Sequence, residues 1–175
     1  LLKGQNLAKI LAKISNDDPD TLKNYPLYRL LDIFIKVCSA IDYAHSKNIL
    51  HLDLKPENIH IGEYGEVFVL DWGLAFEKNP DLKESHFDRL KENVSRASSP
   101  LLGTPGYMPP EQIFNDQEML DNRSDVFALG GILYSILSLK RPCRGEGPQE
   151  IINETLTGTF ISPADRCKER SIPLA

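Results

Sequence analysis

The feature that most constrains the fold is an uncharged segment in the C-terminal half of the chain. Residues Val126–Leu139 read VFALGGILYSILSL and contain no acidic or basic side chain. A helix of this length is too short to cross a lipid bilayer, which needs about 20 apolar residues, and matches a helix buried in a protein core. We therefore predict a buried core helix over Asp121–Leu139.

The composition fits one globular unit. The chain has 175 residues, of which 41% are hydrophobic and 26% charged, which is enough apolar mass for one sizeable core. Its formal net charge of -5 does not favour nucleic-acid binding. The start, LLKGQNLAKILAKI, lacks the apolar core and cleavage site of a signal peptide. We expect no membrane segment in this sequence and a cytoplasmic location, with an anchor elsewhere in a longer chain left open.

The three cysteines, Cys38, Cys143 and Cys167, are far apart and odd in number. They lack CxxC spacing, so neither a disulfide framework nor a zinc site is predicted, and a reducing compartment fits best. Cys38 lies on an apolar helical stripe, which favours a small buried side chain over a reactive thiol.

Hydrophobic periodicity predicts further helices. Apolar residues recur at helical spacing over Asn6–Ile14, whereas Ser15–Thr21 is polar, contains proline and is interpreted as a loop. The strongest periodic signal is one apolar face over Leu27–Ala44, which we expect to end near Lys47-Asn48, where asparagine tolerates a left-handed conformation. A shorter helix is expected over Gln149–Leu156.

After the long helix the pattern changes to that of β-structure. Ile59–Ile61 and Val67–Leu70 flank GEYGE, which predicts a β-hairpin with glycine in the turn. A phosphate-cradling loop is the weaker interpretation, because no helix follows and the third glycine is missing. Asn79–Pro100 is charge-dense and is expected to be a long exposed loop with a helical turn around Phe87–Leu90. The predicted fold class is mainly α with a small β-hairpin.

Candidate catalytic side chains gather on the loop between the long helix and the hairpin. His51–Asn58 reads HLDLKPEN and supplies a carboxylate, an ammonium group and an amide from Asp53, Lys55 and Asn58. The hairpin then leads to a second carboxylate, Asp71, in the triplet DWG. Phosphoryl transfer needs a carboxylate to accept the proton of an attacking hydroxyl, a cation for the phosphate oxygens and oxygen ligands for Mg²⁺. A solvated turn residue is the ordinary role of a lone loop aspartate, but it does not explain this combination.

These motifs resemble those of the eukaryotic-type protein kinases. HLDLKPEN matches the catalytic-loop pattern H-R-D-L-x-x-x-N except at the arginine, and DWG matches D-F-G with tryptophan replacing phenylalanine. Gly73 in this triplet is free to adopt a turn that other residues resist. GTPGYMPPE, over Gly103–Glu111, resembles the segment that ends in Ala-Pro-Glu, with Pro109 replacing the alanine.

The resemblance covers essentially the whole chain and is closer to bacterial than to animal members. It implies that residues 1–175 are a partial protein kinase domain: the C-terminal lobe of the kinase-like α+β fold, truncated at both ends. The catalytic loop would be 51–58, the DWG triplet 71–73 and the activation segment 71–111. The N-terminal lobe and the final helices would be absent.

The resemblance also implies roles for the site residues. Asp53 would be the catalytic base, Lys55 would stabilise the transferring phosphoryl group of ATP, and Asn58 and Asp71 would hold Mg²⁺. Lys55 indicates a protein substrate phosphorylated on Ser or Thr rather than Tyr. Thr104 supports this, because it matches the threonine that bridges the substrate-docking loop to the catalytic aspartate and lysine.

Three further residues are implied to support the loop. Asp125 resembles the aspartate that anchors the catalytic-loop backbone, with an exposed carboxylate at a helix N-terminus as the alternative. His51 would be a packing residue that aligns the loop with the triplet, and Glu111 matches a glutamate whose usual arginine partner is missing here. The other histidines share no ligand spacing and are expected to be ordinary surface or helix residues: His45, His60 and His86.

The sequence departs from the family at Leu52, where many kinases have an arginine that pairs with an activation-loop phosphate. Leucine cannot form that pair. We therefore expect that the full-length enzyme does not need phosphorylation of this loop, whose serines include Ser95, Ser98 and Ser99. Loss of activity on phosphatase treatment would contradict this expectation.

The leading function is an ATP- and Mg²⁺-dependent protein Ser/Thr kinase. The sequence contains no G-x-G-x-x-G loop, V-A-I-K lysine or partner glutamate, so the nucleotide would lack the upper half of its site and residues 1–175 alone are expected to transfer no phosphate. The exposed upper surface and the severed C-terminal core are also expected to make this piece marginally stable. One alternative is a pseudokinase, a non-catalytic scaffold of the same fold, which the substitutions Leu52 and Trp72 would allow. Against it, the four polar groups that catalysis needs in this lobe are intact: Asp53, Lys55, Asn58 and Asp71. The other is a small-molecule phosphotransferase, against which GTPGYMPPE argues, because in the family this segment shapes a groove for a protein substrate.

Overall fold

The computed structural model describes residues 3–77, 103–168, 170 and 172. The loop predicted over Asn79–Pro100, with its helical turn, His86 and the three serines, lies outside these residues.

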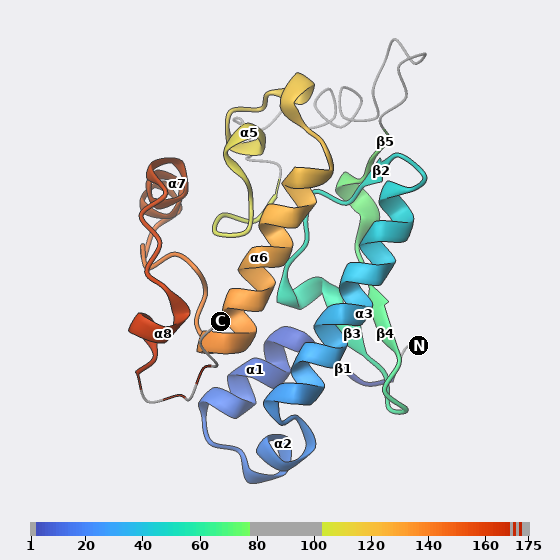
Figure 1. Cartoon of the computed structure of the whole chain (residues 1–175), viewed down its shortest axis with the longest axis vertical. Coiled ribbons are helices and arrows are strands. Elements are labelled where there is room, and N and C mark those ends of the chain that lie inside the picture. The colour runs from blue at the N-terminus through green and yellow to red at the C-terminus, as the bar shows by residue number, and fades with distance from the viewer. Residues whose placement is uncertain (1–2, 78–102, 169, 171, 173–175) are drawn as a thin grey trace.

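Helix α6 runs through the middle of the molecule and the other helices pack around it (Figure 1). α3 lies along one side with the β-strands behind it, and α7 and α8 lie on the other side. α1 and α2 close one end, while α5 and the short η3 turn lie near the opposite end. The helices are α1 (Leu7–Ser15), α2 (Pro19–Asn24), α3 (Leu27–His45), α5 (Pro110–Ile113), α6 (Asn122–Ser138), α7 (Pro148–Thr157) and α8 (Pro163–Arg166).

The central helix confirms the prediction over Asp121–Leu139. Asp121 is its N-cap, and Ser124 completes a capping box by accepting from the Asp121 backbone N–H. Leu139 ends the helix in the left-handed region, at φ 56°. Ile132 and Ile136 in its middle are fully buried, so the uncharged segment forms the centre of the core.

The first helices agree with the sequence except at one point. Asn6 caps α1 by accepting a hydrogen bond from the backbone N–H of Lys9, and α1 buries its predicted apolar face. The loop predicted over Ser15–Thr21 is wrong in its second half, because α2 begins at Pro19 with Asp18 as its N-cap. Proline is favoured at the first helical position, where its missing N–H has no helical partner to lose.

The long helix α3 confirms the second amphipathic prediction. Its apolar face contacts α6 and the strands, and Val37 near its centre is fully buried. Asn48 has φ 58°, as predicted for the residue that turns the chain after the helix. The helix over Gln149–Leu156 is also confirmed, as α7.

Two small antiparallel sheets accompany the helices. β3 (Ile59–Ile61) and β4 (Val67–Val69) form the predicted hairpin, with Gly65 at φ 86° in its turn, and β1 (Gln5–Asn6) adds a third strand beside β3. β2 (Ile49–Leu50) pairs with β5 (Phe76–Glu77) in a second sheet that the sequence did not predict. Short 3₁₀ turns complete the fold: η1 (Pro56–Asn58), η2 (Trp72–Leu74) and η3 (Gln117–Met119).

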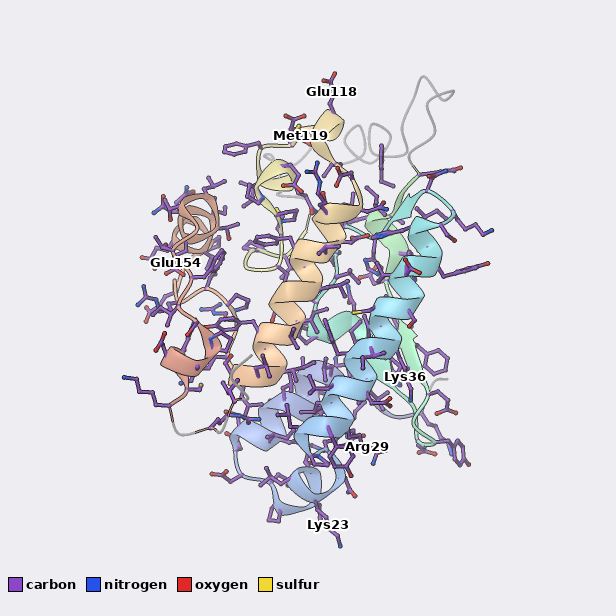
Figure 2. All side chains as sticks on the ribbon, in the orientation of Figure 1. Lys23, Arg29, Lys36, Glu118, Met119 and Glu154 are labelled. Atoms are coloured by element: carbon purple, nitrogen blue, oxygen red, sulfur yellow. The ribbon has the colours of Figure 1, made fainter. Side chains whose placement is uncertain are left out.

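Buried side chains form one main core and a smaller apolar cluster. The main core lies between α1, α3, α6 and β3, and the smaller one joins Leu50, Leu52 and Leu120. All three cysteines are free, and Cys38 is half-buried beside the main core. Among the described residues, no helix has the length and apolarity to span a membrane. Figure 2 shows charged side chains at the periphery, with Glu118 and Lys23 at opposite ends of the long axis.

Candidate active site

The pairing of β2 with β5 brings together the loop that contains Asp53 and the loop that contains the DWG triplet. Leu50 lies opposite Phe76, so the loop that follows β2 starts beside the segment that follows the DWG triplet. The hairpin β3–β4 connects the far ends of the same two loops. The catalytic-loop candidate and the triplet are therefore held at the same edge of the structure by backbone hydrogen bonds.

Asp53 lies in a closed triangle of hydrogen bonds with Lys55 and Thr104. The Lys55 ammonium donates to Asp53 Oδ2 at 2.7 Å and to Thr104 Oγ1 at 2.7 Å. The Thr104 hydroxyl donates to Asp53 Oδ1 at 2.9 Å. The side chains of Asp53 and Lys55 are 9% and 19% exposed. The carboxylate is thus fixed in orientation and still in contact with the surface.

Asn58 is held against the same carboxylate. Its Nδ2 donates to the Asp53 backbone carbonyl at 2.8 Å and to Asp53 Oδ2 at 3.2 Å. These contacts turn the amide nitrogen towards Asp53, so the amide oxygen lies on the other side of the group. An amide oxygen in this position is a ligand of the kind that Mg²⁺ accepts.

Asp71 presents its carboxylate at the surface from a left-handed backbone, with φ 61° and ψ 67°. The prediction that Gly73 makes the unusual turn is wrong, because Gly73 does not have a positive φ. A Cβ at Gly73 would instead lie 3.2 Å from Asp71 Oδ1. The glycine therefore gives the carboxylate space rather than supplying the turn.

His51 connects the two loops from inside the protein. It is fully buried, its Nδ1 accepts from the Asp53 N–H at 3.3 Å, and its Nε2 lies 3.1 Å from the Leu70 carbonyl. Its ring also packs on Trp72, with 4.5 Å between the ring centroids. Burial lowers the pKa of His51, against the opposing effect of nearby carboxylates, of which Asp125 acts most. Its burial, its contacts and the lowered pKa are those of a neutral histidine that packs between the two loops.

Asp125 is buried beneath the catalytic-loop candidate. It is 1% exposed, and its two oxygens accept from the backbone N–H groups of His51 and Leu52, each at 2.9 Å. The alternative of an exposed helix-terminal carboxylate is therefore wrong. His45 is the last residue of α3, in agreement with the expectation of a surface or helix residue. Its side chain is 11% exposed and its Nε2 lies 2.8 Å from Asp125 Oδ2, a contact that the sequence did not predict.

Two neighbouring residues of α5 connect this helix to α6 and to the loop that follows β2. Glu111 Oε1 accepts from the Ser124 hydroxyl at 2.6 Å, which links α5 to the first turn of α6. Gln112 is 7% exposed and donates from Nε2 to the Leu52 carbonyl at 2.7 Å. No local pattern in the sequence marks Gln112, because its partner lies 60 positions away.

The described part of the chain contains no group of three or more His, Cys, Asp or Glu side chains arranged to hold a metal ion. The candidate oxygen donors are the Asn58 amide and the Asp71 carboxylate. Mg²⁺ in phosphate-binding sites typically takes one or two protein carboxylates together with water and substrate oxygens. The donor chemistry of these two side chains fits such an ion.

Comparisons with known proteins agree with these motifs. The model of the protein kinase domain matches residues 2–173. The serine/threonine-protein kinase PknD of Protochlamydia amoebophila (strain UWE25) is 33% identical over 181 residues, covering 98% of this chain and 18% of the relative. PknD of Chlamydia pneumoniae is 39% identical over 148 residues, covering 82% of this chain and 15% of the relative. The chain thus spans less than a fifth of the length of these two relatives.

Proposed function

The chain belongs to the protein kinase family, and from this premise we propose that it is the larger part of the C-terminal lobe of a protein Ser/Thr kinase. The catalytic loop would be 51–58 and the activation segment 71–111. In this proposal the remaining parts of the ATP site lie in a longer chain. The observation that carries the proposal is the triangle of Asp53, Lys55 and Thr104.

Asp53 acts as the base in the proposed reaction. It orients the hydroxyl of a substrate Ser or Thr and accepts its proton, while a bond forms between the hydroxyl oxygen and the γ-phosphorus of ATP. The bond from that phosphorus to the β–γ bridging oxygen breaks, and ADP leaves with the electron pair. Lys55 is close enough to Asp53 to place its positive charge beside the transferring phosphoryl oxygens.

Asn58 and Asp71 hold Mg²⁺ in this proposal. When bound, the ion neutralises charge on the phosphate oxygens and fixes their orientation. The chain's own contribution is to keep the two oxygen donors in place. Asn58 is oriented by its hydrogen bonds to Asp53, and the glycine two residues after Asp71 leaves room for its carboxylate.

Thr104 supports a protein acceptor. It lies one residue beyond Gly103, at the start of the segment GTPGYMPPE, and its hydroxyl contacts both Lys55 and Asp53. A peptide that docks on this segment would therefore present its hydroxyl next to the base. The positions of the segment and the base are coupled through one threonine side chain.

The test uses the full-length protein that carries this sequence. It is incubated with Mg²⁺, labelled ATP and a generic protein substrate, and the products are analysed for phosphoserine and phosphothreonine. We expect both the transfer and its loss in Asp53→Asn, while Asp32→Asn on the exposed face of α3 retains it. A protein that binds ATP but transfers no phosphoryl group would be a pseudokinase scaffold. A protein that phosphorylates only small hydroxyl compounds would be a small-molecule phosphotransferase.

A further inference from the structure

The residue before the proposed base has an unusual backbone. Leu52 has φ 61°, in the left-handed region that leucine rarely occupies. Its carbonyl and the following N–H set the direction in which the chain enters Asp53. A conformation of this kind persists only where surrounding contacts hold it.

The contacts that hold Leu52 come from three parts of the molecule. Asp125, on α6, accepts a hydrogen bond from the Leu52 N–H at 2.9 Å. Gln112, on α5, donates to the Leu52 carbonyl at 2.7 Å. The leucine side chain is 4% exposed and packs with Leu50 and Leu120. Both polar groups of the strained residue are thus bound by side chains distant in sequence.

The hydrogen bond from Gln112 is enclosed by the start of the GTPGYMPPE segment. Gly103 has φ 128°, and a Cβ at this position would lie 2.7 Å from Gln112 Nε2 and 3.5 Å from the Leu52 carbonyl oxygen. Only glycine lets the backbone pass this close with this conformation. The buried amide and carbonyl are therefore covered by the segment that also carries Thr104.

We propose that Gln112 is a positioning residue for Asp53, acting through the Leu52 carbonyl. This inference rests on the proposed kinase function. In it, docking of α5 on α6 fixes the direction of the catalytic loop, because one amide joins α5 to the peptide that precedes the base. Gln112 contacts neither substrate nor reacting atoms, so its removal lowers turnover and leaves nucleotide affinity intact.

The experiment compares Gln112→Met with wild type in the full-length protein. Methionine keeps the length and packing of glutamine but donates no hydrogen bond. We expect kcat to fall about ten-fold, the scale of one intramolecular hydrogen bond, with the KM for ATP changed less than about two-fold. Gln149→Met, at an exposed glutamine in the first turn of α7, serves as the matched control and keeps wild-type kinetics.

Hydrogen exchange gives a second readout that does not depend on activity. If the hydrogen bond from Gln112 holds Leu52 in place, the backbone amides of Leu52 and Asp53 exchange faster in Gln112→Met than in wild type or Gln149→Met. Unchanged exchange would show that Gln112 does not hold Leu52. Faster exchange with unchanged kcat would overturn the positioning role. A wild-type protein without Asp53-dependent transfer defeats the proposed function and with it the positioning role, while exchange still decides whether Gln112 holds Leu52.

Discussion

Thr104 is the residue whose hydroxyl connects the segment GTPGYMPPE to the proposed base. It accepts from Lys55 and donates to Asp53, so a single oxygen keeps the ammonium and the carboxylate in one arrangement. Without it, Lys55 and Asp53 would still attract each other, but neither would be held to the segment that begins at Gly103. The hydroxyl should therefore matter more to turnover than to folding.

Thr104→Ala is expected to lower kcat at least about ten-fold, because one charge-assisted hydrogen bond is lost on each side of the hydroxyl. Thr104→Ser keeps the hydroxyl and should stay within about three-fold of wild type. Steady-state kinetics of the full-length protein with a protein substrate provide the measurement. A wild-type kcat in the alanine variant, or equal losses in both variants, would contradict the bridging role.

Residues of the site differ in how far the sequence could identify them. The motif residues were identifiable because they lie within a few positions of one another and resemble a family pattern. His45 and Gln112 were missed because their partners are 80 and 60 positions away, and no local spacing marks such pairs. The sequence analysis placed the unusual turn of the triplet at Gly73, because glycine adopts such turns most easily, whereas the residue with a positive φ is Asp71.

At the scale of elements, α6 packs closely against the segment before α5 through one of two adjacent glycines. A Cβ at Gly131 would lie 2.8 Å from the Tyr107 ring, whereas a Cβ at Gly130 would meet no atom within 4 Å. The Tyr107 hydroxyl also lies 3.0 Å from the Ser135 hydroxyl, one turn further along α6. Substitutions of the two glycines therefore provide a matched test of the packing of Tyr107 on α6.

Gly131→Ala is expected to destabilise the protein by about 1–3 kcal/mol, because the ring must move. Gly130→Ala should stabilise it by about 0.5–1 kcal/mol, because alanine is the better helix former and the site is open. Urea unfolding of both variants provides the measurement. Equal effects of the same sign would show that Tyr107 does not pack on α6 as described.

Tyr107 also makes stability depend on alkaline pH. Burial raises its pKa to about 12, while the hydrogen bond with Ser135 acts in the opposite direction. The neutral form of Tyr107 is thus favoured in the folded state. Its contribution to the free energy of unfolding is complete below about pH 10, the pKa of tyrosine in the unfolded chain, and is lost as the pH rises towards about 12. Tyr107→Phe should show a smaller fall in unfolding free energy from pH 9 to 11. Identical falls in the two proteins would contradict the raised pKa of the Tyr107 phenol.

The long helices were predictable, whereas the two-residue strands and the short helix α2 were not. The apolar periodicity of α3 and the uncharged run of α6 each extend over several turns, so the signal accumulates. The two-residue strands β1, β2 and β5 have no room for a pattern, and they exist because distant segments pair. α2 was missed because Pro19 was treated as a breaker, although proline starts a helix well behind an aspartate cap.

For the whole molecule, α6 is the element that joins the main core to the candidate site. Its buried side chains complete the main core, and its first turn binds the loop that follows β2 through Asp125 and α5 through Ser124. The core and the site therefore share one support.

Ile132 tests this central position. It is fully buried in the main core, so Ile132→Ala should cost about 2–5 kcal/mol of unfolding free energy. Val126 lies on the same helix but is 57% exposed, and Val126→Ala should change stability by less than about 1 kcal/mol. Urea or thermal unfolding distinguishes the two. Similar losses would mean that α6 is not the centre of the core.

The most direct test of the account is the rate of phosphoryl transfer by the full-length protein carrying Asp53→Asn. General-base catalysis contributes about 10²–10⁴-fold, so the rate should fall by at least about 100-fold, with ATP affinity within about three-fold of wild type. Asp32→Asn, at a carboxylate that is 59% exposed and pairs with Lys36, should keep the wild-type rate. Transfer by Asp53→Asn at the wild-type rate would contradict the claim that Asp53 is the base.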